Sequence, residues 1–537
     1  MKRPTSRKDY ITTVMGISLI GMMIFRLVMG KLVGDKGMAC FGSANEIYFI
    51  VAGTFSFGLS EAVSVLVRYR VRREQYKSAQ RVLGGALLLG GLAGAFLGLF
   101  ILVLSKKVAG GILHMPIAGL AVSMMAPSIF FFILTGIFRG YFQGNGSRVP
   151  AMHSQVLQVI FTYAGGIAGA FMYREYGQKV SALLRNEDYT SAYGAKGACI
   201  GILAASILCF LHVLVIYFVF RRNIRNQLGR EMQKNQDSRL YIFRMILGTG
   251  GIYALYWFFF HASVLAGEIV LFQFSKETAG LIGKWGAYYG KALAITGIAG
   301  EIVCMACLAP VRRIAVLWER EEYRAAREKV AVLIHQCAAI AIPTAVLLAV
   351  LSENLLNVIF GGDNHQTAVW IQTGSITIVF FVLSTVFTDM LLKGKRISYA
   401  VGIGASAFVL HIGVMILLVN TGWDIPALIV GSIAFYMVIT GCGFWIIMRK
   451  LQYNQEWIRT FAVTIVASAI TGVIAMLLNK VFEPLLGALV SLLICVMVSV
   501  LVYLVLLTFM RAFRDDEMDE MAGGFLFRKL AEVFHIG

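Results

Sequence analysis

Charged side chains are scarce in this sequence. Asp, Glu, Lys and Arg make up only 14% of its 537 residues, whereas about 25% is usual for a soluble globular protein. Hydrophobic residues make up 58%, and the mean hydropathy is +0.76. The apolar residues come in runs of about 20, the length that crosses a hydrocarbon core roughly 30 Å thick. The lack of charge therefore excludes a soluble protein and predicts an all-α polytopic membrane protein.

Motifs for catalysis and metal binding are also missing. The sequence has no Gly-Lys-Ser/Thr phosphate loop, no His-Glu-x-x-His and no segment large enough for a soluble nucleotide-binding domain. Its eight cysteines are scattered. Cys304 and Cys307 form a Cys-x-x-Cys, but within an apolar run and without the further ligands that a structural zinc site needs. We therefore expect no enzymatic activity, no metal, no cofactor and no disulfide framework.

Windowed hydrophobicity predicts about fourteen membrane-spanning helices. Their approximate ranges are 11–33, 47–67, 82–104, 117–138, 156–173, 198–220, 246–272, 287–308, 330–351, 369–392, 399–419, 425–448, 460–478 and 485–509. Gly165 and Gly169 are four residues apart in the fifth span, a spacing that favours close approach of a neighbouring helix. The predicted parts are an N-terminal six-helix lobe (1–222), a basic cytoplasmic linker (223–244), a C-terminal six-helix lobe (245–450), an additional helix pair (451–510) and a cytoplasmic tail (511–537).

The distribution of Lys and Arg predicts that both termini are cytoplasmic. Of the 48 basic residues, 35 fall in segments on the side of the N-terminus and 11 on the other side, while Arg26 and Lys291 fall within spans. Cytoplasmic loops of membrane proteins carry such an excess. The same distribution explains the net charge of +19, because basic loops face anionic lipids. We expect anionic membrane lipids as partners and no nucleic acid.

The sequence contains an internal repeat. Glu74 to Ala79 follows the second span and matches Glu321 to Ala326, which follows the eighth. Leu134 to Phe138 likewise matches Leu383 to Phe387, and a Gly- and basic-residue-rich loop follows each. Because six spans, an even number, separate the matching points, both halves have the same orientation. This predicts two parallel lobes related by an axis along the membrane normal.

Three charged residues fall within predicted spans at similar depth: Arg26, Glu268 and Lys291. A charge left in hydrocarbon costs several kcal/mol, so a cation there attracts an anionic group. Alternatively, Arg26 and Lys291 reach the outer headgroups on their long side chains. We predict that Arg26 and Lys291 bind an anionic substrate and that Glu268 lies close to them.

Two further carboxylates, Glu61 and Glu301, lie deeper, toward the cytoplasmic ends of the second and eighth spans. Each could titrate or bind a coupling cation, or make a structural hydrogen bond to a neighbouring helix. We predict that Glu61, Glu268 and Glu301 balance the charge or couple transport to H⁺, Na⁺ or the membrane potential.

Two stretches resemble a known family. Gly34-Asp35-Lys36-Gly37 through Glu61-Ala62-Val63-Ser64 resembles the first helical hairpin of the multidrug/oligosaccharidyl-lipid/polysaccharide (MOP) exporter superfamily. The linker between the fourth and fifth spans is similar to that of its stage V sporulation protein B and polysaccharide biosynthesis branch, and it reads Phe138-Arg139-Gly140-Tyr141-Phe142-Gln143-Gly144. In that branch an acidic residue is expected shortly after Ser154-Gln155, where this sequence has Gln158.

The resemblance implies two six-helix lobes around a central cavity, as in the MATE transporters, with two extra C-terminal helices. It also implies a flippase that moves a lipid-linked glycan of the undecaprenyl-pyrophosphate type, or a cell-wall precursor, from the inner to the outer leaflet of the bacterial cytoplasmic membrane by alternating access. The resemblance further implies that members of the branch with a peptidoglycan precursor as substrate carry cations on spans that line this cavity, including the first and eighth, where Arg26 and Lys291 stand here.

Two other functions stay open. One is an ion-coupled multidrug or cation antiporter of the same superfamily, for which twelve spans would be typical. The other is a non-transporting scaffold for cell-wall or sporulation enzymes. The tail, with its acidic Asp515-Asp516-Glu517 and an amphipathic stretch behind it, could serve either a partner or the membrane surface.

Overall fold

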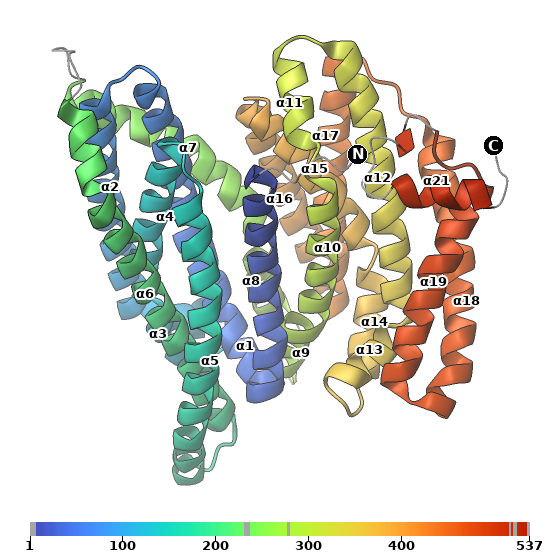
Figure 1. Cartoon of the computed structure of the whole chain (residues 1–537). Coiled ribbons are helices and arrows are strands. Elements are labelled where there is room, and N and C mark those ends of the chain that lie inside the picture. The colour runs from blue at the N-terminus through green and yellow to red at the C-terminus, as the bar shows by residue number, and fades with distance from the viewer. Residues whose placement is uncertain (1–6, 230–236, 276–279, 515–516, 519–523, 534–537) are drawn as a thin grey trace. The chain divides into compact units, whose positions relative to one another are not determined.

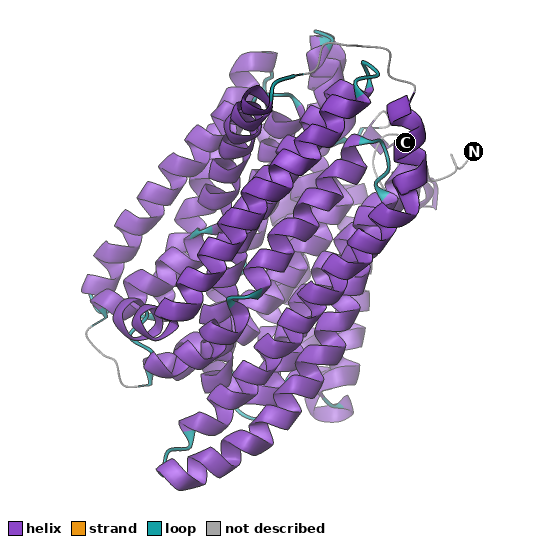
Figure 2. Ribbon diagram, turned by 90° about the vertical axis from the view of Figure 1, so that its left-hand side faces the viewer, coloured by secondary structure: helices purple, strands orange, loops and turns teal. Residues whose placement is uncertain are grey.

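The structure is a computed structural model that describes residues 7–229, 237–275, 280–514, 517–518 and 524–533. Within these ranges the chain forms helices joined by loops and contains no strand (Figure 2). The predicted all-α architecture is therefore confirmed. Residues 230–236 of the predicted linker, and Asp515 and Asp516 of the predicted acidic cluster, lie outside the described residues.

The helices pack as two compact units. The first comprises the described residues up to Gly290 together with Met415–Asp424, and the second comprises Lys291–Val414 and the described residues from Ile425 onward. These units group helices by packing, and the predicted lobes, which rest on the sequence repeat, stay a prediction.

Figure 1 labels most of the helices. Those up to the end of the first unit are α1 (Arg7–Val71), α2 (Tyr76–Lys107), η1 (Val108–Ile112), η2 (Pro116–Ala118), α3 (Gly119–Met125), α4 (Ser128–Gly144), α5 (Val149–Leu184), α6 (Asp188–Gly229), α7 (Arg239–His261), α8 (Ser263–Phe274), α9 (Leu281–Ala287) and the π-helix η3 (Tyr288–Ala292). Those that follow are α10 (Leu293–Cys307), α11 (Val311–Glu319), α12 (Tyr323–Val350), α13 (Ser352–Ile359), α14 (His365–Gly374), α15 (Thr377–Lys393), α16 (Ile397–Asn420), α17 (Ile425–Leu451), η4 (Ile458–Ala462), α18 (Val463–Leu486), α19 (Ala488–Phe509) and α21 (Gly524–Val533).

Twelve helices of the described residues are long and apolar enough to cross a membrane, or 13 with the pair α14 and α15, which is bent by 43°. That number includes α1 once, although its 65 residues would extend about 97 Å at 1.5 Å per residue, three times the hydrocarbon thickness. Gly34, with φ 72° and ψ 176°, breaks α1 into two helices. Counted as two spans, α1 brings the number to the 14 that the sequence predicts.

The segments that match in the sequence form similar turns in the backbone. Glu74 (φ 60°) and Glu321 (φ 63°) are both left-handed and directly precede the N-caps of α2 and α12. Gly146 (φ 92°) and Lys395 (φ 57°) likewise follow the ends of α4 and α15. In all four turns the left-handed residue donates its N–H to the carbonyl three positions back, and the next residue donates five positions back. This is the hydrogen-bond pattern of a Schellman ending.

Glycines bring α5 and α6 into direct backbone contact. A Cβ atom on Gly169 would lie 2.2 Å from the carbonyl oxygen of Gly197, and one on Gly165 would lie 3.1 Å from the Cα of Gly201. No larger side chain fits between these backbones, so the close approach predicted from Gly165 and Gly169 is confirmed.

The tail returns to its own chain in the second unit. Phe513 and Phe527 pack with ring centroids 4.8 Å apart. They belong to a buried cluster that includes Ala339 of α12, Ala467 of α18 and Leu507 of α19. The cluster fixes the start of the tail and α21 against the helices that precede them.

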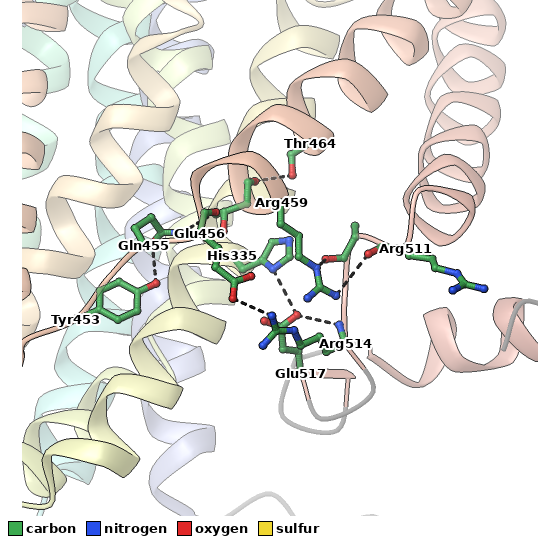
Figure 3. A network of polar contacts seen from close by, with 11 residues as sticks. His335, Tyr453, Gln455, Glu456, Arg459, Thr464, Arg511, Arg514 and Glu517 are labelled. Carbon is green, nitrogen blue, oxygen red and sulfur yellow. Dashed lines mark hydrogen bonds and ion pairs between the residues drawn. The ribbon is translucent and has the colours of Figure 1, made fainter.

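Polar contacts reinforce this attachment (Figure 3). Arg459 Nε donates to the carbonyl of Ala512 at 2.9 Å, and Arg514 pairs with Glu456 at 2.8 Å. Glu517 lies 3.6 Å from Nδ1 of His335 and accepts the backbone N–H of Arg514 at 3.0 Å. Burial raises the pKa of Glu517, but the hydrogen bond from His335 and the other contacts outweigh it, so that the pKa lies below its ordinary 4.5.

Candidate functional site

The first unit contains a buried polar cluster in its apolar interior. We call it the Arg26–Glu268 cluster, and its members are Arg26, Ser43, Asn45, Glu46, Glu268 and Tyr289. Arg26 comes from the first half of α1, the next three residues from its second half, Glu268 from α8 and Tyr289 from η3. The break at Gly34 lets one long helix contribute from both of its halves.

Glu46 is the centre of one chain of contacts. Its side chain is 4% exposed, and its Oε1 lies 3.4 Å from Nη2 of Arg26. The Tyr289 hydroxyl donates to the same oxygen at 2.8 Å and accepts from Nδ2 of Asn45 at 2.9 Å. The Tyr289 ring also lies 4.7 Å from Cζ of Arg26, a cation–π contact. Arg26 is therefore balanced by a carboxylate rather than being an uncompensated cation.

Glu268 is fully buried and has no cationic partner among the described residues. Its Oε1 is in close contact with the Ser43 hydroxyl, which also lies 3.0 Å from the carbonyl of Ala39. A hydroxyl has only one proton to donate. When Ser43 donates to Ala39, the contact with Glu268 is a hydrogen bond only if the carboxyl group is protonated. The arrangement therefore accommodates a proton on Glu268.

The second oxygen of Glu268 is also informative. Oε2 is buried and accepts no hydrogen bond within the described chain, and the Trp285 indole, which is near the carboxyl group, lies outside hydrogen-bonding geometry. Glu46 is near enough to interact electrostatically. Two carboxyl groups therefore share one buried environment with a single arginine, which suits uptake of one proton or one small monovalent cation.

Lys291 belongs to the second unit. Its Nζ lies 3.3 Å from Oδ1 of Asn364 and 5.2 Å from the centroid of the Phe360 ring. Asn364 is buried and donates to the carbonyl of Gly361 at 2.7 Å. The loop between α13 and α14 thus orients the lysine.

Of the three residues expected in one cluster, Arg26 and Glu268 belong to the first unit, and Lys291 belongs to the second. Arg26 pairs with Glu46, and Glu46 is near enough to Glu268 to interact with it electrostatically. Glu61, on the second half of α1, is half-buried and interacts electrostatically with Arg68 and Arg148. Glu301, on α10, is half-buried in the second unit. The roles predicted for these residues stay predictions.

Sequence reasoning missed Glu46 and Tyr289. The second span was predicted to begin at Ile47, which placed Glu46 in a loop, whereas the helix runs on from Asp35. Apolar residues from Met38 to Phe41 continue the helical pattern upstream and could have revealed this. Tyr289 stands two residues before Lys291 but carries no charge to draw attention to it.

The family-like motif at the end of α4 joins three helices. A Cβ atom on Gly140 would lie 2.2 Å from the Ser60 carbonyl, and one on Gly144 would lie 2.8 Å from Cβ of Val67, so both glycines pack on α1. Gln143 is half-buried, and its carbonyl accepts the N–H of Gly146. Arg139 points instead to α5. No group of three or more His, Cys, Asp or Glu in the described ranges could hold a metal ion.

The comparisons with known proteins agree with this architecture. Residues 11–166 match the MatE family model. The chain is 20% identical over 505 residues to the stage V sporulation protein B of Bacillus subtilis (strain 168), covering 92% of each protein.

Two solved structures share the fold. The lipid II flippase MurJ in an inward closed conformation is similar with a TM-score of 0.66 and 15% identity, over 94% of this chain and 99% of that one. An inward-facing MATE family multidrug resistance transporter of the MOP superfamily is similar with a TM-score of 0.64 and 14% identity, over 83% of this chain and 98% of that one.

Proposed function

The chain is a member of the MOP superfamily of membrane transporters, and from that premise we propose that it is a flippase for an anionic lipid-linked glycan. The substrate would be of the undecaprenyl-pyrophosphate type, moved from the inner to the outer leaflet of a bacterial cytoplasmic membrane. Both termini would be cytoplasmic, as the excess of Lys and Arg on their side supports.

The observation that carries this proposal is the helix pair α18 and α19. The pair is built into the second unit: the Tyr503 hydroxyl donates to the Ala339 carbonyl at 2.8 Å, and Nδ2 of Asn354 lies 2.6 Å from Oδ1 of Asn479. The flippase structure covers more of this chain than the multidrug transporter does, by a share close to the length of the pair. Two spans beyond twelve favour the flippase over the antiporter.

The Arg26–Glu268 cluster supports a coupled mechanism. A pyrophosphate headgroup that binds Arg26 competes with Glu46 for the same guanidinium. Glu46 would then be a buried carboxylate without its cation, a costly state unless a proton or cation neutralises it. Glu268 holds a second carboxyl group nearby for that charge. Substrate binding and cation uptake would thus favour each other, as linkage requires.

The other predicted residues fit around this core. Lys291, whose ammonium group Asn364 orients within the second unit, would be a further cation for an anionic substrate. Glu61 and Glu301 would balance charge nearer the cytoplasm. Anionic lipids would contact the basic loops, and cell-wall synthesis enzymes would be partners of the protein.

Flipping in liposomes tests the proposal. The protein is reconstituted with a fluorescent undecaprenyl-pyrophosphate oligosaccharide, and a membrane-impermeant quencher reports the label that reaches the outer leaflet. We expect Arg26→Ala and Lys291→Ala each to lower the rate by about tenfold or more, since a charge-assisted hydrogen bond contributes roughly 1.5–3 kcal/mol. Lys36→Ala is the matched control, because Lys36 is exposed and pairs with Asp188 outside the cluster.

The outcomes separate the site from the function. Equal rates for wild type, Arg26→Ala and Lys291→Ala would refute the cation site. A wild-type protein that moves no pyrophosphate lipid would refute the flippase.

A cation antiporter is the second candidate, because Glu268 is a buried carboxyl group without a cationic partner in the described chain. Accumulation of a lipophilic cation driven by an imposed proton or sodium gradient, and lost in Glu268→Gln, would favour it. If neither lipid nor cation moves, the scaffold function is favoured.

A further inference from the structure

Arg139 is a second intramembrane arginine, and its contacts differ from those of Arg26. It stands five residues before the end of α4, about 7.5 Å along the helix axis. Nε donates to Oγ of Ser154 at 2.6 Å, and Nη2 donates to Oε1 of Gln158 at 3.0 Å. Both acceptors lie on α5, and both are neutral.

No carboxylate of the described residues balances this charge. The ionisable groups that interact with the guanidinium are Tyr48 on α1 and Cys209 on α6, which are neutral at physiological pH. An arginine held by neutral groups within a membrane is costly unless an anion accompanies it.

Hydrogen-bond donors around Arg139 outnumber their acceptors. A guanidinium has five N–H donors, and the two contacts with α5 use only two of them. The Tyr48 hydroxyl is buried without a hydrogen-bond partner in the described chain, because Ser206, although near, lies outside hydrogen-bonding geometry. Thr162 lies one turn beyond Gln158 on α5, and its buried hydroxyl also has no hydrogen-bond partner in the described chain. A ligand with several acceptor oxygens complements such a set.

Access is consistent with a ligand. Arg139 is half-buried, whereas Ser154, which holds its Nε, is fully buried. Nη1 of Arg139 makes neither of the contacts with α5 and is absent from the fully buried polar atoms that lack partners in the described residues, so this nitrogen keeps some accessible surface.

We propose that Arg139, with Ser154, Gln158 and Tyr48, forms a binding site for a phosphoryl-type oxyanion inside the first unit. Arg139 supplies the charge and a planar pair of donors, and Tyr48 of α1 supplies a third donor. Ser154 and Gln158 fix the guanidinium plane. The oxyanion belongs either to the headgroup of a lipid-linked substrate, in which case the inference rests on the proposed function, or to free phosphate.

Binding of two probes to the full-length protein tests the site. The protein is placed in uncharged phosphatidylcholine nanodiscs at fixed ionic strength and titrated calorimetrically with inorganic pyrophosphate and, separately, with farnesyl pyrophosphate. Saturable binding of either probe is expected. Binding of the lipid alone indicates the headgroup as the source, and equal affinity for both indicates free phosphate.

Variants tie binding to Arg139. Gln158→Glu keeps the size of the side chain and gives Arg139 a permanent carboxylate partner. We expect it to weaken probe binding by about 10- to 100-fold, the effect of losing a charge-assisted hydrogen bond, without lowering thermal stability. Gln178→Glu, which adds the same charge at an exposed position about 30 Å farther along α5, should bind as wild type does. Arg139→Gln should abolish binding, and Arg139→Lys should retain part of it.

Unchanged affinity in Gln158→Glu would overturn the site even if Arg139→Gln failed to fold. Failure of wild type to bind either probe would overturn it as well. Probe binding that depends on Arg139 in a protein that flips no lipid would refute the proposed function and leave this site intact.

Discussion

Replacing Glu46 by Gln removes the carboxylate that balances Arg26 and keeps the size of the side chain. The Gln amide oxygen still accepts from the Tyr289 hydroxyl, so the substitution isolates the charge. An exposed ion pair contributes about 0–1 kcal/mol, and breaking a buried pair costs about 3–5 kcal/mol. Arg26 keeps 21% of its side-chain exposure while Glu46 keeps 4%. We therefore expect Glu46→Gln to lower the free energy of unfolding by about 2–3 kcal/mol.

The assay is a double-mutant cycle with Arg26→Gln, measured by denaturant unfolding in mixed micelles. Because most of the loss in Glu46→Gln comes from leaving Arg26 without its partner, the double variant should be more stable than Glu46→Gln alone. Because the Arg26 guanidinium no longer pairs with a carboxylate in Glu46→Gln, the affinity of this variant for a pyrophosphate lipid should be higher than that of wild type. Stability and affinity are thus expected to change in opposite directions.

Two results would refute this reasoning. One is a loss of stability in Glu46→Gln of the same size with and without Arg26, which would mean that the pair is not the cause. The other is a fall in pyrophosphate-lipid affinity, which would mean that Glu46 does not compete with the headgroup.

Three further predictions follow from packing and from the tail. Gly169→Ala should destabilise the protein by about 1–3 kcal/mol through overpacking against Gly197, whereas Gly91→Ala, which meets nothing within 4 Å, should not, as thermal unfolding will show. Tyr503→Phe should cost about 1 kcal/mol by removing the bond to Ala339, in the same measurement. The pKa of Glu517 is lowered in the folded chain, so its contribution to tail attachment is fully present above about pH 4.5 and is lost as the pH falls through the lower folded pKa. In wild type, protection of the tail from protease should therefore decrease as the pH falls below about 4.5. In Glu517→Gln, protection should not change over the same pH range.

The sequence predicted those features of the fold that depend on short stretches of chain. The length of a span follows from the thickness of the membrane, so about fourteen spans could be predicted from the sequence. The matching segments could be recognised in the sequence because each of their turns is built from a few consecutive residues. A window average does not distinguish an apolar loop from a helix that continues beyond its span, so the sequence indicates a loop where the structure has a sharp break inside α1.

The site was predictable only in part. Arg26 and Glu268 were conspicuous because charge is rare in an apolar run. Their neighbours were not, since Glu46 lay at the predicted edge of a span, and its partner Tyr289 is 243 residues away. Whether a buried charge is balanced depends on such distant pairings. For the same reason the sequence shows Arg139 only as part of a motif, and its lack of a carboxylate partner among the described residues is seen only in the fold.

The repeated turns have a consequence for how the protein is made. The paired hydrogen bonds at Glu74 and Gly146 join residues at most five positions apart, as do those at Glu321 and Lys395. Each turn can therefore close as soon as its own few residues leave the ribosome. The N-terminal copies can set where one helix ends and the next begins before the C-terminal half is synthesised, in keeping with the sequential folding of nascent chains.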